Sequence, residues 1–550
     1  MTNSPTAAAG AAKRSHLFTL ARLRSWLVAE FPLLLLVLAT ASLRMVLHDD
    51  VSLADEAGYV KTGIGMIHGL HPAWSDFPGY CALYTLGYAA TGSATAAYFI
   101  GRAIGSAALI GAVWYGTRSF TSRRTAFVVS FLVAALGAPY VWPGVGMFAA
   151  ALLAVGSVLL VRRPDVRGCA AASVFFWWAA TVRLEYWPAA AACSLCTGWY
   201  LFQEMRRRRV APSVAPSARE PSMLWPALSF AVPAALFALR LPIGEGRLWN
   251  AFGAHYALAN PIRGQSPWTG WQAVLVRDFG SSTSIPGALM AAPVKFLSFV
   301  GGNVLRTPLY FGALLLERHG PYLGGLAVSV IAAVLLIAPL GKLAADRISR
   351  RRSVAKTGTA RPTAIIAAYL PIGVLAVINV GILTVIYPRY HYLILWVPGL
   401  AIVAGVGMER ALAPSASKVL SQFAVVLVLA PLVASTVFYA AQVPRKPLAE
   451  TVYEMARLPG HHVLLSGDWG LSAYDSDVTE IDSGPLPGGV LTFSQFLREK
   501  NADLVLVGYY LDGGPWSALP GYAAFVSDPA KFGYTRISVG SPLWVRSDRL

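Results

Sequence analysis

The chain has 550 residues, of which 56% are hydrophobic and 13% are charged, and its mean hydropathy is +0.54. This composition excludes an ordinary water-soluble globular protein and predicts that most of the chain lies in lipid. The formal net charge of +18 does not indicate nucleic acid as a partner. The basic residues stand between apolar runs, whereas a nucleic-acid groove gathers them on one soluble surface with exposed aromatics.

Apolar stretches recur along the chain from Glu30 to Tyr439. Each is long enough to cross a bilayer as a helix, at about 17 to 25 residues, and we count about eleven of them. The runs cover residues 28–47, 94–118, 125–143, 144–161, 168–185, 186–203, 223–241, 321–341, 363–386, 391–408 and 419–440. The sequence therefore predicts a mainly α fold, a polytopic bundle of transmembrane helices.

Basic residues between these runs predict a topology. They fall on alternate connections, within residues 13–24, 118–124, 162–167, 206–209 and 342–352. Because positive charge is retained on the cytoplasmic side, we predict a cytoplasmic N-terminus and a C-terminus on the opposite side. The first run, with Ala39-Thr40-Ala41, also resembles a cleavable secretory signal, but its length favours an uncleaved helix.

This topology divides the chain into three parts. Residues 1–27 form a basic cytoplasmic N-terminus, residues 28–440 a transmembrane domain, and residues 441–550 a soluble extracytoplasmic domain. Two large loops, 49–93 and 242–320, lie on the outer side. The pattern of the C-terminal domain predicts a small α/β fold. Its predicted strands cover 462–465, 479–481, 504–507 and a closing pair near Ile537 and Val545, and its predicted helix covers 493–500.

The segment Asp55-Glu56-Ala57-Gly58-Tyr59 follows the first apolar run by a few residues. Carboxylates at this place stand at the boundary between water and lipid, which makes Asp55 and Glu56 candidate catalytic groups and Tyr59 a candidate substrate contact. The structural alternative is a capping box, in which Ser52 caps a helix and the acidic residue three positions later returns the bond.

A second polar segment, Tyr387-Pro388-Arg389-Tyr390-His391, stands at the outer mouth of a predicted helix pair. The guanidinium of Arg389 could bind a phosphate through two parallel hydrogen bonds, with Tyr390 beside it and His391 as a candidate substrate contact. The alternative is an interfacial anchor, in which Arg389 touches lipid phosphates among belt aromatics.

Other ionisable and aromatic residues are weaker candidates. Arg102 lies within the second apolar run, where a charge is costly and usually faces a polar cavity. Arg183 and Glu185 are undecided between a cavity and a pair at the membrane interface. In the long loop, His255 and Tyr256 could stack on a sugar, but their aromatic surroundings favour an amphipathic helix lying in the interface.

Together these features resemble the GT-C membrane glycosyltransferases, and the nearest branches are the protein O-mannosyltransferases and the aminoarabinose transferases of lipid A. The resemblance implies a catalytic Asp in the first outer loop, commonly followed by Glu, and an Arg-Tyr segment near the donor phosphate. Asp55-Glu56 and Arg389-Tyr390 are the matching positions here. The family often carries an acidic residue in the turn after its third helix, where this chain has Trp142-Pro143-Gly144.

The resemblance implies transfer of a sugar, with inversion, from a polyprenyl-phosphate donor to an envelope hydroxyl on the outer face of a bacterial plasma membrane. The acceptor could be a lipid, a glycan or a protein. Arg102 would be a second phosphate contact. No cofactor is certain, and the missing acidic residue leaves a divalent metal open. The alternatives are a lipid or solute transporter, whose charged residues would line a path to both faces, and a non-catalytic assembly protein, which would tolerate loss of Asp55.

Overall fold

The computed structural model describes most of the chain, with gaps. The described residues are 30–48, 50–72, 77–135, 144–210, 224–238, 247–262, 270–316, 362–411, 446–466, 470–481, 492–507, 511 and 515–550. Two of the predicted apolar runs, 321–341 and 419–440, lie outside them.

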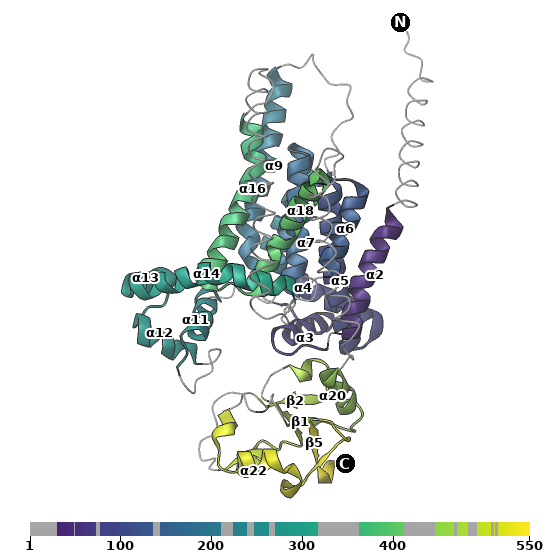
Figure 1. The fold of residues 1–550 in the computed structure, drawn as a ribbon, viewed down its shortest axis with the longest axis vertical. Coiled ribbons are helices and arrows are strands. Elements are labelled where there is room, and N and C mark those ends of the chain that lie inside the picture. Colours follow the sequence, from purple (N-terminus) through teal and green to yellow (C-terminus); the bar gives the residue numbers. More distant parts are fainter. Residues whose placement is uncertain are drawn as a thin grey trace.

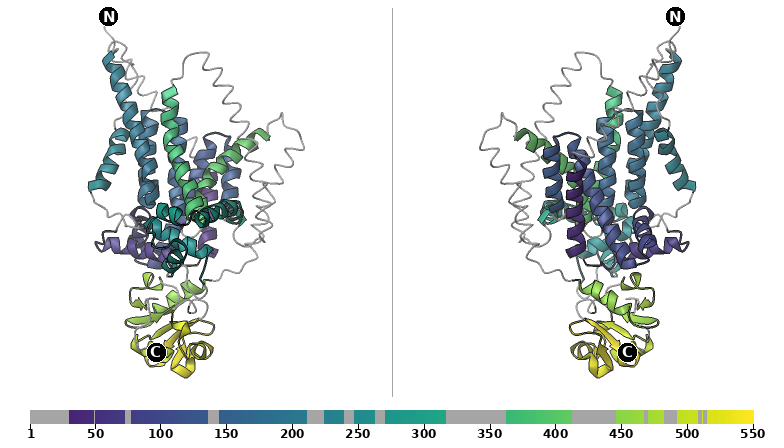
Figure 2. Two further views of the ribbon diagram at one scale, coloured as in Figure 1. Left: turned by 90° about the vertical axis from the view of Figure 1, so that its left-hand side faces the viewer. Right: turned by 90° about the vertical axis from the view of Figure 1, so that its right-hand side faces the viewer.

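Every other predicted run contains a helix, because a helix satisfies its own backbone hydrogen bonds in an apolar environment. These helices are α2 (Phe31–His48), α5 (Ala94–Arg118), α6 (Arg123–Ala135), α7 (Val145–Arg162), α8 (Val166–Val182), α9 (Trp187–Val210), α10 (Leu224–Ala238), α16 (Pro362–Gly381) with its π-helical end η4 (Ile382–Ile386), and α17 (Tyr390–Leu393) with α18 (Val397–Ala411). The long helices run side by side as a bundle (Figures 1 and 2).

Among the described residues, four helical segments are long and apolar enough to cross a membrane, and a bent pair of helices would make a fifth. The four are Ala94–Arg118, Val145–Arg162, Tyr369–Ile386 and His391–Glu409. These helices fit a membrane protein, while the larger predicted number of spans stays a prediction.

The predicted outer loops are themselves largely helical, and of these helices the sequence predicted the one around His255 and Tyr256. The first holds α3 (Asp55–Ile67) and α4 (Pro78–Thr91), and the second holds α11 (Arg247–Ala259), α12 (Trp271–Phe279), α13 (Ile285–Ala291) and α14 (Pro293–Leu316). The helices of both loops lie at the end of the bundle that faces the C-terminal residues (Figure 1).

The described residues between 446 and 550 form a small α/β unit around a five-stranded sheet with the order β2-β1-β3-β5-β4. The first three strands in this order are parallel and the last pairs are antiparallel. The strands and helices are β1 (His462–Leu465), β2 (Val478–Glu480), β3 (Leu504–Leu506), β4 (Tyr534–Arg536), β5 (Leu543–Arg546), α20 (Pro447–Met455), α21 (Phe493–Glu499) and α22 (Tyr522–Ser527). The predicted strands and the predicted helix are confirmed within a few residues.

This α/β unit is joined to the helical part at the residues just before α3. The carboxylate of Asp50 accepts hydrogen bonds from the N–H groups of Leu448 and Ala449, both at 2.8 Å, and so caps α20 across 398 residues of chain. The Tyr474 hydroxyl donates to the carbonyl of Ser52 at 2.6 Å. One hydrophobic core continues from α3 into the sheet, so the two parts pack as a single body.

Replacing Asp50 by alanine is expected to loosen this joint, because two N–H groups at the start of α20 lose their acceptor. The loss of such a cap costs about 1–2 kcal/mol. Limited proteolysis of the purified protein should therefore release residues 446–550 faster from the variant than from the parent. Asp528→Ala is the control, since its exposed pair with Lys531 contributes little; equal rates for both variants would contradict the joint.

Candidate functional site

Asp55 is the first residue of α3 and its side chain is exposed. The residue before it, Ala54, has φ 54° and ψ −126°, a conformation that L residues rarely adopt. The capping-box interpretation is wrong: no side chain caps α3, and the hydroxyl of Ser52 lies instead 2.9 Å from that of Tyr98. The positive end of the helix dipole favours a charged carboxylate at Asp55.

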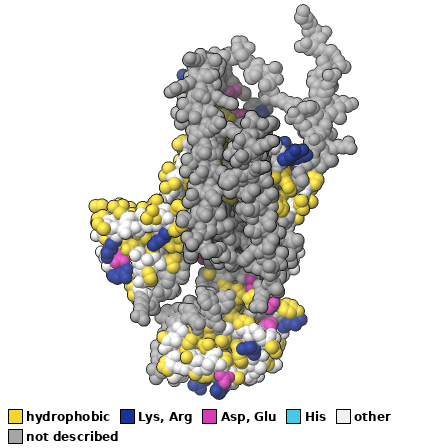
Figure 3. Space-filling view, in the orientation of Figure 1, with side chains coloured by type: hydrophobic (Ala, Val, Ile, Leu, Met, Phe, Trp, Pro, Cys, Tyr) yellow, Lys and Arg dark blue, Asp and Glu magenta, His cyan; other side chains and the backbone are white. Residues whose placement is uncertain are grey.

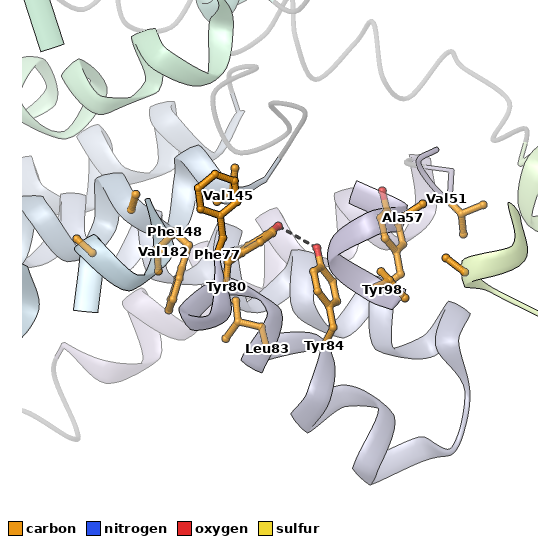
Figure 4. Packing of buried hydrophobic residues seen from close by; sticks show 14 of the residues in the cluster. Val51, Ala57, Phe77, Tyr80, Leu83, Tyr84, Tyr98, Val145, Phe148 and Val182 are labelled. Carbon is orange, nitrogen blue, oxygen red and sulfur yellow. Dashed lines mark hydrogen bonds between the residues drawn. The ribbon is translucent and has the colours of Figure 1, made fainter. Parts of the chain in front are cut away.

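Glu56, the next residue, is fully buried and its carboxylate is enclosed by hydrogen-bond donors. Tyr80 donates to Oε1 at 2.5 Å, Tyr84 donates to the same oxygen, and the Gly144 N–H donates to Oε2 at 2.8 Å. The two tyrosine hydroxyls lie 2.9 Å apart, as Figure 4 shows. We call Glu56, Tyr80, Tyr84 and Gly144 the carboxylate cage.

Burial raises the pKa of both tyrosines well above the ordinary value, and the charge of Glu56 raises it further. Both hydroxyls therefore keep their protons and act as donors. The four-residue spacing of Tyr80 and Tyr84, which places both on one face of α4, is the feature of the sequence that could have predicted this pair of donors.

Position 144 requires a glycine. A Cβ at this position would lie 2.4 Å from both the Tyr80 hydroxyl and Nη1 of Arg102.

Arg102 is buried beside this cage, and its predicted role as a second phosphate contact stays a prediction. It packs against Gly144, and its charge acts on Tyr80 and Tyr84. A buried carboxylate needs such a positive neighbour.

The cage does not fit a metal. The oxygens of Glu56 are already engaged by hydroxyl and amide donors, and a guanidinium stands beside them. Among the described residues, no group of three His, Cys, Asp or Glu side chains converges in a way that could hold a metal ion.

Arg389 is half-buried and immediately precedes α17, where its carbonyl accepts hydrogen bonds from the N–H groups of Tyr392 and Leu393. His255 of α11 lies beside it and stacks on the ring of Tyr387 at 5.8 Å. Burial and the charge of Arg389 lower the pKa of His255 to about 4, so this imidazole is neutral at neutral pH. The structure thus brings His255 beside Arg389 and His391, which lie far from it in the sequence.

Arg183, which the sequence left undecided, belongs to the same group. Its guanidinium lies 4.7 Å above the ring of Tyr392 and 2.5 Å from the carboxylate of Glu185. It is almost fully buried, and its Nη1 has no hydrogen-bond partner among the described residues. We call Arg183, Arg389, His255 and His391 the arginine cluster.

The first turn of α7 joins the carboxylate cage to the arginine cluster. Gly144 donates to Glu56, and two residues later a Cβ at Gly146 would lie 2.4 Å from the carbonyl oxygen of His391. Tyr59 belongs to the cage side of this junction, since its ring packs edge-on against Tyr80 at 5.4 Å. Carboxylates and guanidinium groups therefore meet at one end of the bundle.

The other candidates are placed differently. Tyr256 packs in a separate core with Phe279 and Phe299, and its hydroxyl donates to Asp278 at 3.2 Å, so it does not join the arginine cluster. The side chain of Tyr390 lies outside the described part of the structure. Asp50, which also stands near Asp55, is occupied by the cap of α20.

No family model and no curated protein matches the chain. Among solved structures, the chain is similar to the oligosaccharyltransferase of Archaeoglobus fulgidus, crystallised in complex with Zn and sulfate. The two share 14% sequence identity, with a TM-score of 0.39, over 85% of this chain and 67% of that one. A likeness of this strength assigns neither activity nor site residues.

Replacement of Glu56 tests the cage. In Glu56→Ala, the Tyr80 and Tyr84 hydroxyls lose their buried acceptor, and each unsatisfied group costs about 1–3 kcal/mol. Glu56→Gln keeps an acceptor oxygen of similar shape and should lose less. Thermal unfolding in detergent should rank the parent above Gln and Gln above Ala; an alanine variant as stable as the glutamine variant would refute the cage.

Proposed function

We propose that the protein is a membrane glycosyltransferase that moves a sugar from a polyprenyl-phosphate donor to a hydroxyl of an envelope acceptor. The observation that supports this most directly is the junction at α7, where Gly144 contacts Glu56 and Gly146 contacts His391. The first turn of α7 thus contacts both Glu56, the neighbour of Asp55, and the backbone of His391, two residues after Arg389. Sugar transfer from a phosphate requires a base for the acceptor and a positive charge for the leaving group.

In the proposed reaction, Asp55 accepts the proton of the acceptor hydroxyl as its oxygen bonds to the anomeric carbon. The bond from that carbon to the phosphate oxygen breaks at the same time, and the electron pair leaves with the polyprenyl phosphate. Arg389 binds this phosphate, and the buried Nη1 of Arg183 offers a further donor. One displacement inverts the anomeric configuration. Glu56 orients α3 through the cage, and Arg102 balances its charge.

The distribution of buried charge favours this reading over a transporter. Within the described helical residues, the buried carboxylate and guanidinium groups belong to Glu56, Arg102 and Arg183. Gly144 connects Glu56 with Arg102 at the end of the bundle that faces the α/β unit, and Arg183 packs on Tyr392 close to the same turn of α7. A transporter would need charged residues along a path to the other face.

The function is tested by reconstituting the protein in liposomes with polyprenyl-phosphate sugars and a detergent extract of envelope acceptors. Mass spectrometry should detect free polyprenyl phosphate and a glycosylated acceptor, both in amounts that grow with time. Movement of the intact donor between leaflets without cleavage would identify a transporter instead. If the donor is neither cleaved nor moved, the result would favour a non-catalytic assembly protein.

The proposed site also requires that the C-terminus lies outside the cytoplasm and that the basic segments lie inside it. Alkaline phosphatase fused after Leu550 is expected to be active and the same enzyme fused after Arg352 inactive, because the basic segments are retained in the cytoplasm. The reverse pattern would place the arginine cluster on the cytoplasmic side and exclude a plasma membrane enzyme of the outer face.

A further inference from the structure

The helices α13 and α14 expose an apolar stripe. The side chains of Met290, Val294 and Leu305 are 82%, 80% and 77% exposed, which is far more than large apolar residues show in contact with protein. Leu297 and Val304 are also more than half exposed. A continuous apolar surface of this kind indicates contact with another protein or with a membrane, because its exposure to water is unfavourable.

The stripe follows one face of α14. Its exposed positions from 294 onward recur every three or four residues and include Lys295 and Ser298 as polar members; the apolar ones are Val294, Leu297, Val304, Leu305 and Leu309. The opposite face is also mostly apolar, since Phe296 and Phe299 are buried there in a core with α11 and α12. A helix that is apolar on both faces is buried on both.

The position of α14 indicates what covers the exposed face. The helix lies across the ends of the long helices at the level of α4 and α11 (Figures 1 and 2), and it is bent by 119° from α13. It packs on η4, where the Asn303 amide donates to the carbonyl of Thr384 at 2.9 Å. Because η4 continues α16, the stripe adjoins the exposed apolar residues of a candidate membrane span, among them Val377 at 73%.

Figure 3 shows hydrophobic side chains gathered over this projecting part of the molecule, with a few charged side chains among them. The charges of Arg277, Asp278 and Lys295 pair with one another, with Lys295 Nζ 2.7 Å from Asp278. An apolar surface edged by basic residues matches the boundary between acyl chains and phosphates in a bilayer.

We propose that α13 and α14 lie in the plane of the membrane, with this stripe buried among the acyl chains of the leaflet that faces the α/β unit. The partner is the lipid bilayer itself. The helix α14 also contacts the segment that contains Arg389. The hydroxyl of Tyr310 on α14 lies 2.8 Å from that of Tyr387, two residues before Arg389. Membrane insertion of α14 therefore fixes Arg389 at headgroup depth, a consequence that rests on the proposed function.

The test places an environment-sensitive thiol probe at Met290→Cys or Leu305→Cys in the full chain, reconstituted in phosphatidylcholine and phosphatidylglycerol vesicles. The four native cysteines are buried, so the introduced thiol reacts first. Val377→Cys on the candidate span is the control for lipid, and Val539→Cys, on the fully exposed surface of the α/β unit, is the control for water.

We expect brominated lipids to quench the probe at positions 290 and 305 to the same extent as at 377, and aqueous iodide to quench it only at 539. Quenching by iodide at 290 and 305 would overturn the proposal. Cross-linking of two copies through these thiols would overturn it too, in favour of a second protein molecule. The readout needs no activity, so the outcome is independent of the reaction proposed for the site.

Discussion

Asp55→Asn is expected to lower the rate of sugar transfer by on the order of a hundredfold to ten-thousandfold, because an amide cannot accept a proton from the attacking hydroxyl. The effect should fall on kcat, since the amide keeps nearly the same shape and the side chain is exposed. The assay follows release of polyprenyl phosphate in vesicles that hold equal amounts of each protein.

The matched control is Asp165→Asn, which changes a carboxylate that caps α8 through the N–H of Gly168 at 2.8 Å. A general effect of removing a negative charge from a helix start would appear in both variants. Near-normal turnover by the Asp55 variant would remove the general base from the mechanism. The neighbouring carboxylates could not easily replace it, because Asp50 caps α20 and Glu56 is enclosed in the carboxylate cage.

Arg389→Lys is expected to lower transfer about tenfold to a hundredfold although the positive charge is kept, because a charged hydrogen bond contributes about 1.5–3 kcal/mol and an ammonium cannot form two parallel ones. The same variant should leave the protein folded, since the carbonyl of Arg389 that accepts hydrogen bonds at the start of α17 is unchanged.

Arg277→Lys serves as the control, because Arg277 is exposed and pairs with Asp278 away from the arginine cluster. An interfacial anchor at position 389 would tolerate lysine, which also touches lipid phosphates. Wild-type transfer by Arg389→Lys would therefore support the anchor and end the phosphate role of this residue.

The sequence singled out Asp55 and Arg389 as candidates, but it did not predict the residues that surround them. Asp55 stood out through its place after the first apolar run, and the structure puts it at an exposed helix start. Ser52 matched a capping pattern that the structure does not use, because Tyr98 from α5 binds its hydroxyl instead. Arg183 was noticeable in the sequence as a charge at the end of an apolar run. Its partner Tyr392 is more than 200 residues away, so the sequence could not predict their contact.

The helix expected around His255 and Tyr256 is present as α11, and its place in the membrane interface stays a prediction. Both residues are buried, and the most exposed apolar side chains of this loop, Met290, Val294 and Leu305, belong to α13 and α14, which the sequence did not predict as helices. Pro293 and Pro308 weaken the helical pattern of this segment, yet α14 runs through Pro308.

Local composition by itself determined the apolar helices and the strands of the α/β unit, because hydrophobic length and alternation act within one segment. Tertiary structure alone decided that Tyr80, Tyr84 and Gly144 enclose Glu56, that Asp50 caps α20, and that α7 joins the carboxylate cage to the arginine cluster. Each of these contacts joins residues that are distant in the chain. Their partners are fixed by how the helices pack, and no pattern within a single segment carries that information.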